Sequence, residues 1–161
     1  MSAFEYKEYS VLMSVYHKER SEYLKQAIES IQVQSLSTND FVLVCDGPLN
    51  DELDAVIQTK QLEMGESLNV VRLAKNGGLG NALNEGIKHC KNELVARMDS
   101  DDIAYPDRCE KQIAVFNTHS EASICSGIVE EFTTDPNTAD TRRVPPETNA
   151  EIIEFAKKRN P

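Results

Sequence analysis

Four short apolar runs alternate with four stretches that carry apolar residues at helical spacing, and this alternation restricts the possible folds most strongly. The apolar runs are 10–16, 41–45, 68–73 and 94–98, and the helical stretches are 23–33, 51–64, 80–89 and 107–119. Apolar runs of this length between polar residues are typical of buried strands. Strands that alternate with helices through short connections form a sheet that is mainly parallel, with helices on both faces. The sequence therefore predicts an α/β fold.

The pattern changes in the last quarter of the chain. Residues 124–133 suggest one strand, or two with a bend at Gly127; residues 135–148 are rich in Pro, Thr, Asp and Asn and suggest a loop; residues 149–158 suggest a helix. A length of 161 residues suits one domain with its own core. We therefore expect a single domain with its core at 9–127 and an irregular extension at 128–161.

The charge of the chain excludes one class of partner. The formal net charge is −10, and the only basic clusters are 142–143 and 157–159, so we expect no nucleic-acid surface. An acidic protein that binds a phosphate-bearing ligand needs a cation between the two.

The cysteines and the N-terminal segment point to the cytoplasm. The four cysteines are widely spaced without a CxxC pair, which is typical of reduced thiols. The first eight residues are not a signal peptide, and the chain has no apolar stretch of 18 residues. We therefore expect membrane association to be peripheral at most.

A cluster of acids follows the last apolar run. Residues 94–98 lead directly into Asp99, Asp101 and Asp102. Such carboxylates repel one another unless a cation or open water lies among them. Ligands of open α/β sheets bind just beyond the carboxyl ends of the strands. The cluster therefore indicates either a divalent-metal site that faces a phosphate-bearing ligand or a solvated turn that caps the helix after Pro106, and its pattern alone favours neither.

Three further residues lie at strand ends. Asp46 ends the run 41–45, so it would share a sheet edge with the acid cluster and accept hydrogen bonds from a base or a ribose. Its alternative interpretation is an Asp-Gly turn. Tyr16 could stack on a base or simply close the core, and Ser14 is small enough to let a base ring approach.

A glycine-rich loop precedes the third predicted helix. Residues 76–80 (NGGLG) suggest either phosphate binding at a helix N-terminus or close packing of the loop against the sheet. The spacing does not match GxGxxG after a first strand, and GxxxxGK[ST] is absent from the sequence. The loop is therefore neither a dinucleotide fingerprint nor a P-loop.

Taken together, these motifs resemble the nucleotide-sugar-binding half of family 2 glycosyltransferases, which have the Rossmann-like GT-A fold. Enzymes of bacterial exopolysaccharide and capsule synthesis, including amylovoran-type transferases, are similar to it. The motifs that carry the resemblance are SVLMSVY at 10–16, YLxxAIxSIxxQ at 23–34, VCDG at 44–47, NxG with AxNxG at 76–86, and MDSDD with PxR at 98–108.

The resemblance implies a metal-dependent donor site. The implied nucleotide-sugar-binding residues are Ser14, Tyr16, Asp46, Asn76, Gly78 and Asp99. Asp101, assisted by Asp99, would hold Mn²⁺ or Mg²⁺. The donor would be a UDP-sugar, and the acceptor a saccharide or a lipid-linked saccharide at the inner face of the membrane. A homodimer is a separate expectation, because a truncated domain can expose an apolar face through which two copies pair.

Family members invert the anomeric centre with the help of a general base, and the chain offers no base in a matching context. Glu130, Glu131 and Glu147 lack the expected surroundings, so we expect the base beyond residue 161 and a chain truncated before the acceptor segment. Two alternatives stay open. One is a catalytically silent nucleotide-sugar or metal-binding module. The other is a nucleotidyltransferase, which normally has a glycine-rich basic loop where this chain has HKER at 17–20.

Overall fold

The structure is a computed structural model that describes residues 7–158. Residues 1–6 and 159–161, which include part of the N-terminal segment and Arg159 of the second basic cluster, lie outside this range. The chain divides into two compact units, and the division falls between Ser120 and Glu121.

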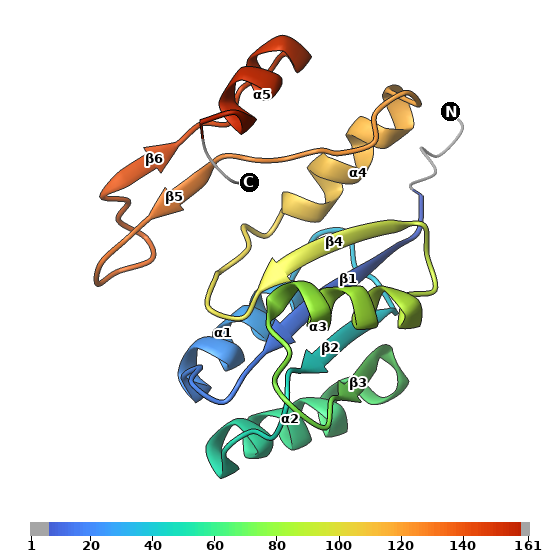
Figure 1. Cartoon of the computed structure of the whole chain (residues 1–161), viewed down its shortest axis with the longest axis vertical. Helices are drawn as coiled ribbons and strands as arrows, with labels where there is room; N and C mark the ends of the chain where they lie inside the picture. The colour runs from blue at the N-terminus through green and yellow to red at the C-terminus, as the bar shows by residue number, and fades with distance from the viewer. Residues whose placement is uncertain (1–6, 159–161) are drawn as a thin grey trace. The chain divides into compact units, whose positions relative to one another are not determined.

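The first unit is built on a four-stranded sheet in which every strand is parallel to its neighbours (Figure 1). The strand order is β3-β2-β1-β4, so the first strand lies inside the sheet and the last forms an edge. The strands are β1 (Tyr9–Val15), β2 (Phe41–Cys45), β3 (Leu68–Arg72) and β4 (Leu94–Asp99). These bounds confirm the four strands that the apolar runs predicted.

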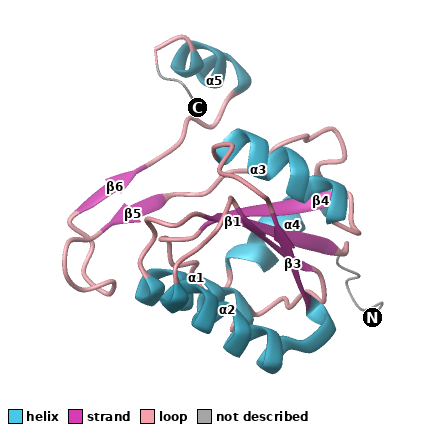
Figure 2. Ribbon diagram, turned by 60° about the horizontal axis from the view of Figure 1, so that its bottom comes forward, coloured by secondary structure: helices cyan, strands magenta, loops and turns pink. Residues whose placement is uncertain are grey.

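Helices cover both faces of this sheet, as predicted (Figure 2). The helices of the first unit are α1 (Ser21–Gln32), α2 (Asp51–Met64), α3 (Leu79–Gly86) and α4 (Arg108–Thr118), with 3-10 turns η1 (Gly65–Ser67) and η2 (Ile87–His89). Buried residues of α1, α2 and α4 share one apolar cluster with Val11 and Met13 of β1. Leu12 points to the other face and clusters with Ala82 of α3. Alternate residues of a strand therefore serve two cores.

The strand order explains why, among the described helices of the first unit, α3 is the one that covers its face of the sheet. The chain moves outward from β1 to β2 and β3, and then crosses back to place β4 on the other side of β1. Crossover connections between parallel strands are right-handed, so a reversed direction of travel puts the connecting helix on the opposite face. The reversal creates a switch point beside β1, where ligands of such sheets bind.

The second unit contains a short hairpin and a helix. Strands β5 (Val129–Glu131) and β6 (Thr141–Arg143) pair antiparallel, and α5 (Asn149–Ala156) follows. The predicted helix at 149–158 is confirmed, but the predicted loop at 135–148 is wrong at β6. This strand is polar throughout and is held by ion pairs that join Arg142 to Glu130 and Arg143 to Glu131. A strand that is stabilised by cross-strand charge pairs needs no alternation of apolar and polar residues, so β6 lacks the sequence pattern by which strands are recognised.

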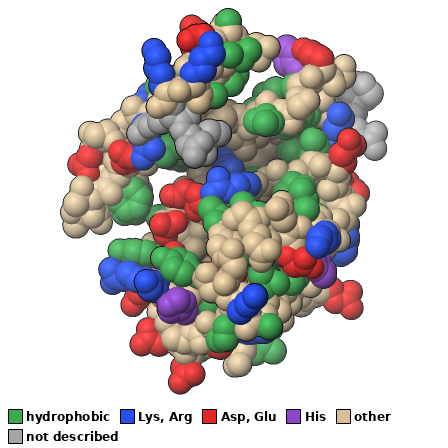
Figure 3. All heavy atoms as spheres, viewed as in Figure 1, with side chains coloured by type: hydrophobic (Ala, Val, Ile, Leu, Met, Phe, Trp, Pro, Cys, Tyr) green, Lys and Arg blue, Asp and Glu red, His purple; other side chains and the backbone are tan. Residues whose placement is uncertain are grey.

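Charged side chains of both signs are interspersed over the face drawn in Figure 3. Several acids of the first unit form ion pairs. Asp54 of α2 pairs with Arg72 of β3 at 2.7 Å, and Asp107 pairs with Lys111, four residues later in the sequence, at 2.5 Å. The negative charge of the chain is thus partly neutralised by local pairs. A group of acids with too few basic partners therefore stands out from the rest of this surface.

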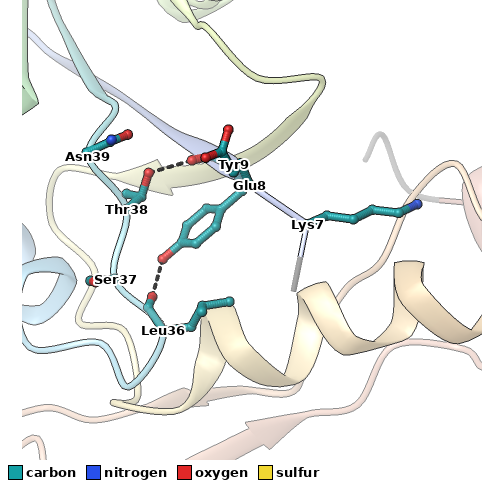
Figure 4. A pocket seen from close by; sticks show the side chains of 7 residues that line it. All are labelled: Lys7, Glu8, Tyr9, Leu36, Ser37, Thr38 and Asn39. Carbon is teal, nitrogen blue, oxygen red and sulfur yellow. Dashed lines mark hydrogen bonds between the residues drawn. The ribbon is translucent and has the colours of Figure 1, made fainter. Parts of the chain in front are cut away.

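A pocket of about 280 Å³ lies where β1 begins (Figure 4). Its lining residues are Lys7, Glu8, Tyr9, Leu36, Ser37, Thr38 and Asn39. The Tyr9 hydroxyl donates to the Leu36 carbonyl, and the Thr38 hydroxyl donates to the Tyr9 carbonyl. This pocket contains none of the site residues predicted from the sequence, all of which lie at the opposite ends of the strands or in loops that follow them.

Candidate functional site

The carboxyl ends of β1, β2 and β4 bring three predicted residues to one edge of the sheet. In the strand register, Ser14 of β1 lies between Val44 of β2 and Asp99 of β4. The Asp46 amide donates to the Val15 carbonyl at 2.8 Å, which places Asp46 directly beside the end of β1. Ser14, Asp46 and Asp99 therefore surround the switch point.

Tyr16 is the first residue after β1 and is exposed over 42% of its surface. Its ring makes an edge contact with the His17 ring, with 5.8 Å between the centroids. This exposure is compatible with both interpretations of Tyr16, a ring that stacks on a base and an aromatic at the edge of the core. An exposed ring at a strand end has a free face on which a planar ligand can stack.

Asp46 joins the end of β2 to the glycine-rich loop. Its carboxylate is buried and accepts hydrogen bonds from the backbone amides of Gly77 at 2.8 Å and Gly78 at 2.9 Å. The Asn76 side chain donates to the Asp46 carbonyl at 3.2 Å. Gly47 has φ +88°, and a Cβ there would lie 2.6 Å from the Asn76 nitrogen. The Asp-Gly turn and the Asn-Gly-Gly loop, read separately in the sequence, thus form one interlocked structure.

This arrangement bears on the predicted phosphate site. The amides of Gly77 and Gly78, at the start of α3, already bind an anion, which is the carboxylate of Asp46. A negative charge at a helix N-terminus is favourable, and here it comes from the chain itself. A bound phosphate would have to use other donors.

The acid cluster forms an open turn after β4. Asp99 forms an ion pair with Arg97, and Asp101 and Asp102 are exposed, whereas Ser100, between Asp99 and Asp101, is buried. Although the residue as a whole is exposed, neighbouring atoms partly desolvate the Asp102 carboxyl and raise its pKa, and the negative charges of Asp99 and Asp101 raise it further. The turn thus carries more negative charge than its neighbours neutralise.

The fit of a divalent cation to this turn depends on how many ligands the protein must supply. Within residues 7–158, no three His, Cys, Asp or Glu side chains lie together as a ready-made metal centre. Mg²⁺, however, is usually held by one or two carboxylates together with substrate phosphates and water. Accessible carboxylates with excess negative charge are the donor chemistry that such a hard cation prefers. Asp99 and Asp101 therefore fit a cation shared with a phosphate ligand.

Two polar side chains, one in α1 and one just after it, support this turn and were not predicted from the sequence. The buried Gln34 side chain donates to the Tyr105 carbonyl at 2.7 Å and accepts from the Cys109 amide at 2.9 Å. The Ser30 hydroxyl accepts from the Ala104 amide at 3.0 Å. Both residues belong to the motif at 23–34. The only sign of their role in the sequence is that they are polar residues among the apolar positions of this motif.

Arg108 supports the same turn from α4. Its guanidinium donates to the Arg97 carbonyl at 2.8 Å and to the Met98 sulfur at 3.0 Å, and also contacts Gln112 at 3.2 Å. The arginine of the PxR motif therefore packs beneath the end of β4 as a support for the strand end.

Comparison with known protein families identifies the family of this chain. The family description "Glycosyl transferase family 2" matches residues 10–161. The chain belongs to glycosyl transferase family 2. The resemblance drawn from the motifs is confirmed.

Two curated relatives cover nearly all of this family 2 chain. It is 42% identical over 153 residues to the amylovoran biosynthesis glycosyltransferase AmsE of Erwinia amylovora, covering 95% of this chain and 56% of the relative. It is 32% identical over 154 residues to the UDP-Gal:alpha-D-GlcNAc-diphosphoundecaprenol beta-1,3-galactosyltransferase of Escherichia coli, covering 96% and 55%. The chain thus spans about half the length of the curated relatives it matches.

Solved structures confirm the GT-A fold. S. aureus TarS 1–349, in complex with UDP-GlcNAc, superposes with a TM-score of 0.59 at 26% identity, over 70% of this chain and 32% of that one. Within the described part of the chain, no helix combines the length and apolar character that crossing a membrane requires.

Proposed function

We propose that this family 2 chain binds a nucleoside-diphosphate sugar, in the first place a UDP-sugar, for transfer to a saccharide or lipid-linked saccharide in surface polysaccharide synthesis. The observation that carries the proposal is the meeting of Ser14, Asp46 and Asp99 at the switch point of the sheet. The relatives named for amylovoran and diphosphoundecaprenol chemistry support the polymer and the acceptor class. The UDP-GlcNAc complex of TarS supports the donor class.

The base of the donor would lie between Tyr16 and Asp46. Tyr16 offers an exposed ring for stacking, and Ser14 leaves room beside the strand. Each carboxylate oxygen of Asp46 accepts one loop amide and can accept a second hydrogen bond, so it can bind the imide N–H of a pyrimidine. Asn76 and Gly78 would shape this side of the pocket through the same loop.

The diphosphate would lie over the acid turn. Asp101 would ligate Mn²⁺ or Mg²⁺, and Asp99 would bond the ribose or share the metal. When bound, such a cation neutralises charge on the departing nucleoside diphosphate. Arg97 pairs with Asp99 and so limits the rotation of this carboxylate in the unliganded chain.

The proposed transfer inverts the anomeric centre, and this requires a base that takes the proton of the acceptor hydroxyl. We assign no residue to this role. Glu130 and Glu131 lie in β5 and form ion pairs with Arg142 and Arg143. This pairing favours, as a second candidate, a nucleotide-sugar-binding module without turnover. The proposed location is cytoplasmic, beside a lipid-linked acceptor, and a homodimer stays a prediction.

Calorimetric titration with UDP and then GDP, each with and without Mn²⁺, tests the proposal. We expect UDP to bind only with Mn²⁺, and Asp101→Ala to abolish the metal-dependent part. Asp140→Ala, which removes an acid of the second unit, is the matched control and should bind as the wild type does. Preference for GDP would overturn the base assignment, and failure of the folded chain to bind either nucleotide would overturn the donor-site proposal.

A further inference from the structure

Glu19 connects the two sides of the proposed donor site. Its amide donates to the Tyr16 carbonyl at 3.0 Å, which closes the turn after β1. One oxygen of its carboxylate accepts from the Arg20 amide at 2.8 Å, and the other accepts from the Ser100 hydroxyl at 3.1 Å. A single side chain therefore joins the loop that carries Tyr16 to the turn that carries the acids.

Ser100 is well placed to receive this contact. It lies between Asp99 and Asp101, and only 6% of its surface is exposed, whereas Asp101 is exposed. The carboxylates on both sides of it repel each other and favour an opened turn. A hydrogen bond that holds the buried hydroxyl of Ser100 opposes this opening.

The other end of the acid turn is fixed independently. Ser30 and Gln34 bind the backbone of Ala104, Tyr105 and Cys109. Loss of the contact between Glu19 and Ser100 should therefore loosen the acidic end of the turn without unfolding the segment that follows it.

We propose that Glu19 is a positioning residue that keeps the base-binding loop and the metal-binding acids in register. This inference rests on the proposed function, because the register matters only for a ligand that spans both sides. A nucleoside diphosphate is such a ligand: its base would contact Tyr16 and its phosphates would share a cation with Asp101. Glu19 acts through Ser100 and does not itself touch the ligand.

A double-mutant cycle tests the inference. Glu19→Ala and Ser100→Ala each remove one partner, Glu19→Gln keeps an oxygen that accepts from Ser100, and Glu22→Ala removes an exposed acid of α1 as a control. We expect each alanine variant to bind UDP about tenfold more weakly in the presence of Mn²⁺, and to need correspondingly more Mn²⁺ for half-saturation. The double variant should be no weaker than either single one. Glu19→Gln should restore most of the affinity.

A second measurement separates this inference from the proposed function. Amide hydrogen exchange of residues 99–103, followed without nucleotide, should be faster in Glu19→Ala and Ser100→Ala than in the wild type. Wild-type binding of UDP with unchanged affinity in both variants would overturn the inference and leave the proposed function intact. If the wild type binds no UDP, the proposed function fails; unchanged exchange in both variants would then overturn the contact as a support of the turn.

Discussion

The carboxylate of Asp46 accepts a hydrogen bond from the Gly78 amide at 2.9 Å, so the end of β2 holds the start of α3 in place. The two residues are 32 positions apart in the sequence. Among the described helices of the first unit, α3 is the one that packs against the face of the sheet to which Leu12 points. One carboxylate therefore links the wall of the proposed base pocket to the helix that covers that face.

Replacement of this carboxylate by an amide should destabilise the fold. In Asp46→Asn one of the two acceptor oxygens becomes an NH₂ group, which faces the Gly77 or Gly78 amide. We expect a loss of about 1–3 kcal/mol in the free energy of unfolding, measured by urea denaturation, together with weaker UDP binding. Asp51→Asn, an exposed acid-to-amide change in α2, should cost far less. Equal losses in the two variants would contradict a special role for Asp46.

Two glycines of α3 should respond in opposite ways to alanine. A Cβ at Gly86 would lie 2.4 Å from a methyl carbon of Leu12 and 2.6 Å from one of Val44, whereas a Cβ at Gly80 would meet nothing within 4 Å. Gly80→Ala should stabilise the chain by about 0.5–1 kcal/mol. Gly86→Ala should destabilise it by about 1–3 kcal/mol because α3 must move away from the sheet. Thermal unfolding of both variants checks this, and a stabilised Gly86→Ala would show that α3 packs less closely than described.

Gln34 should matter more for stability than its position just after α1 suggests. Gln34→Leu leaves the buried Cys109 amide without its acceptor, whereas the Tyr105 carbonyl still accepts from the Arg108 amide at 3.0 Å. We expect a loss of about 1–3 kcal/mol in the free energy of unfolding, because a buried polar group left unsatisfied costs about that much. Gln26→Leu changes an exposed glutamine of α1 and serves as the control in urea denaturation. The prediction fails if Gln34→Leu unfolds at the same urea concentration as Gln26→Leu.

The sequence predicts what local patterns determine. Apolar runs and helical spacing located the four strands and four helices of the first unit, because the hydrophobic period of an element and the turn residues that end it can be recognised within a few residues. The parallel arrangement then placed Asp46 and Asp99 on one edge, because parallel strands end on the same side.

The supports of the site were not predictable in this way. The Gln34 side chain accepts from the Cys109 amide, 75 positions later in the sequence, and the Glu19 carboxylate accepts from the Ser100 hydroxyl, 81 positions later. A polar residue in a helix or loop does not indicate which distant backbone group it will bind. Strand β6 was missed for a related reason: its partners Glu130 and Glu131 lie in another strand, and its own residues show no alternation.

The last prediction concerns stability at high pH. Burial raises the pKa of the Cys45 thiol from about 9 to about 11, although the nearby Arg72 lowers it somewhat. The unfolded chain therefore loses this proton first as the pH rises, and the stability associated with the neutral thiol is complete below pH 9 and is lost towards pH 11. Between pH 8 and pH 10.5 we expect Cys45 to account for a decrease of about 2 kcal/mol in the free energy of unfolding. Other groups also titrate in this range, including Tyr9, whose pKa is raised by burial, so the test compares slopes. Cys45→Ala, measured by urea denaturation across the same pH range, should lose less stability than the wild type by that amount, and parallel pH profiles would show that the folded thiol ionises as freely as the unfolded one.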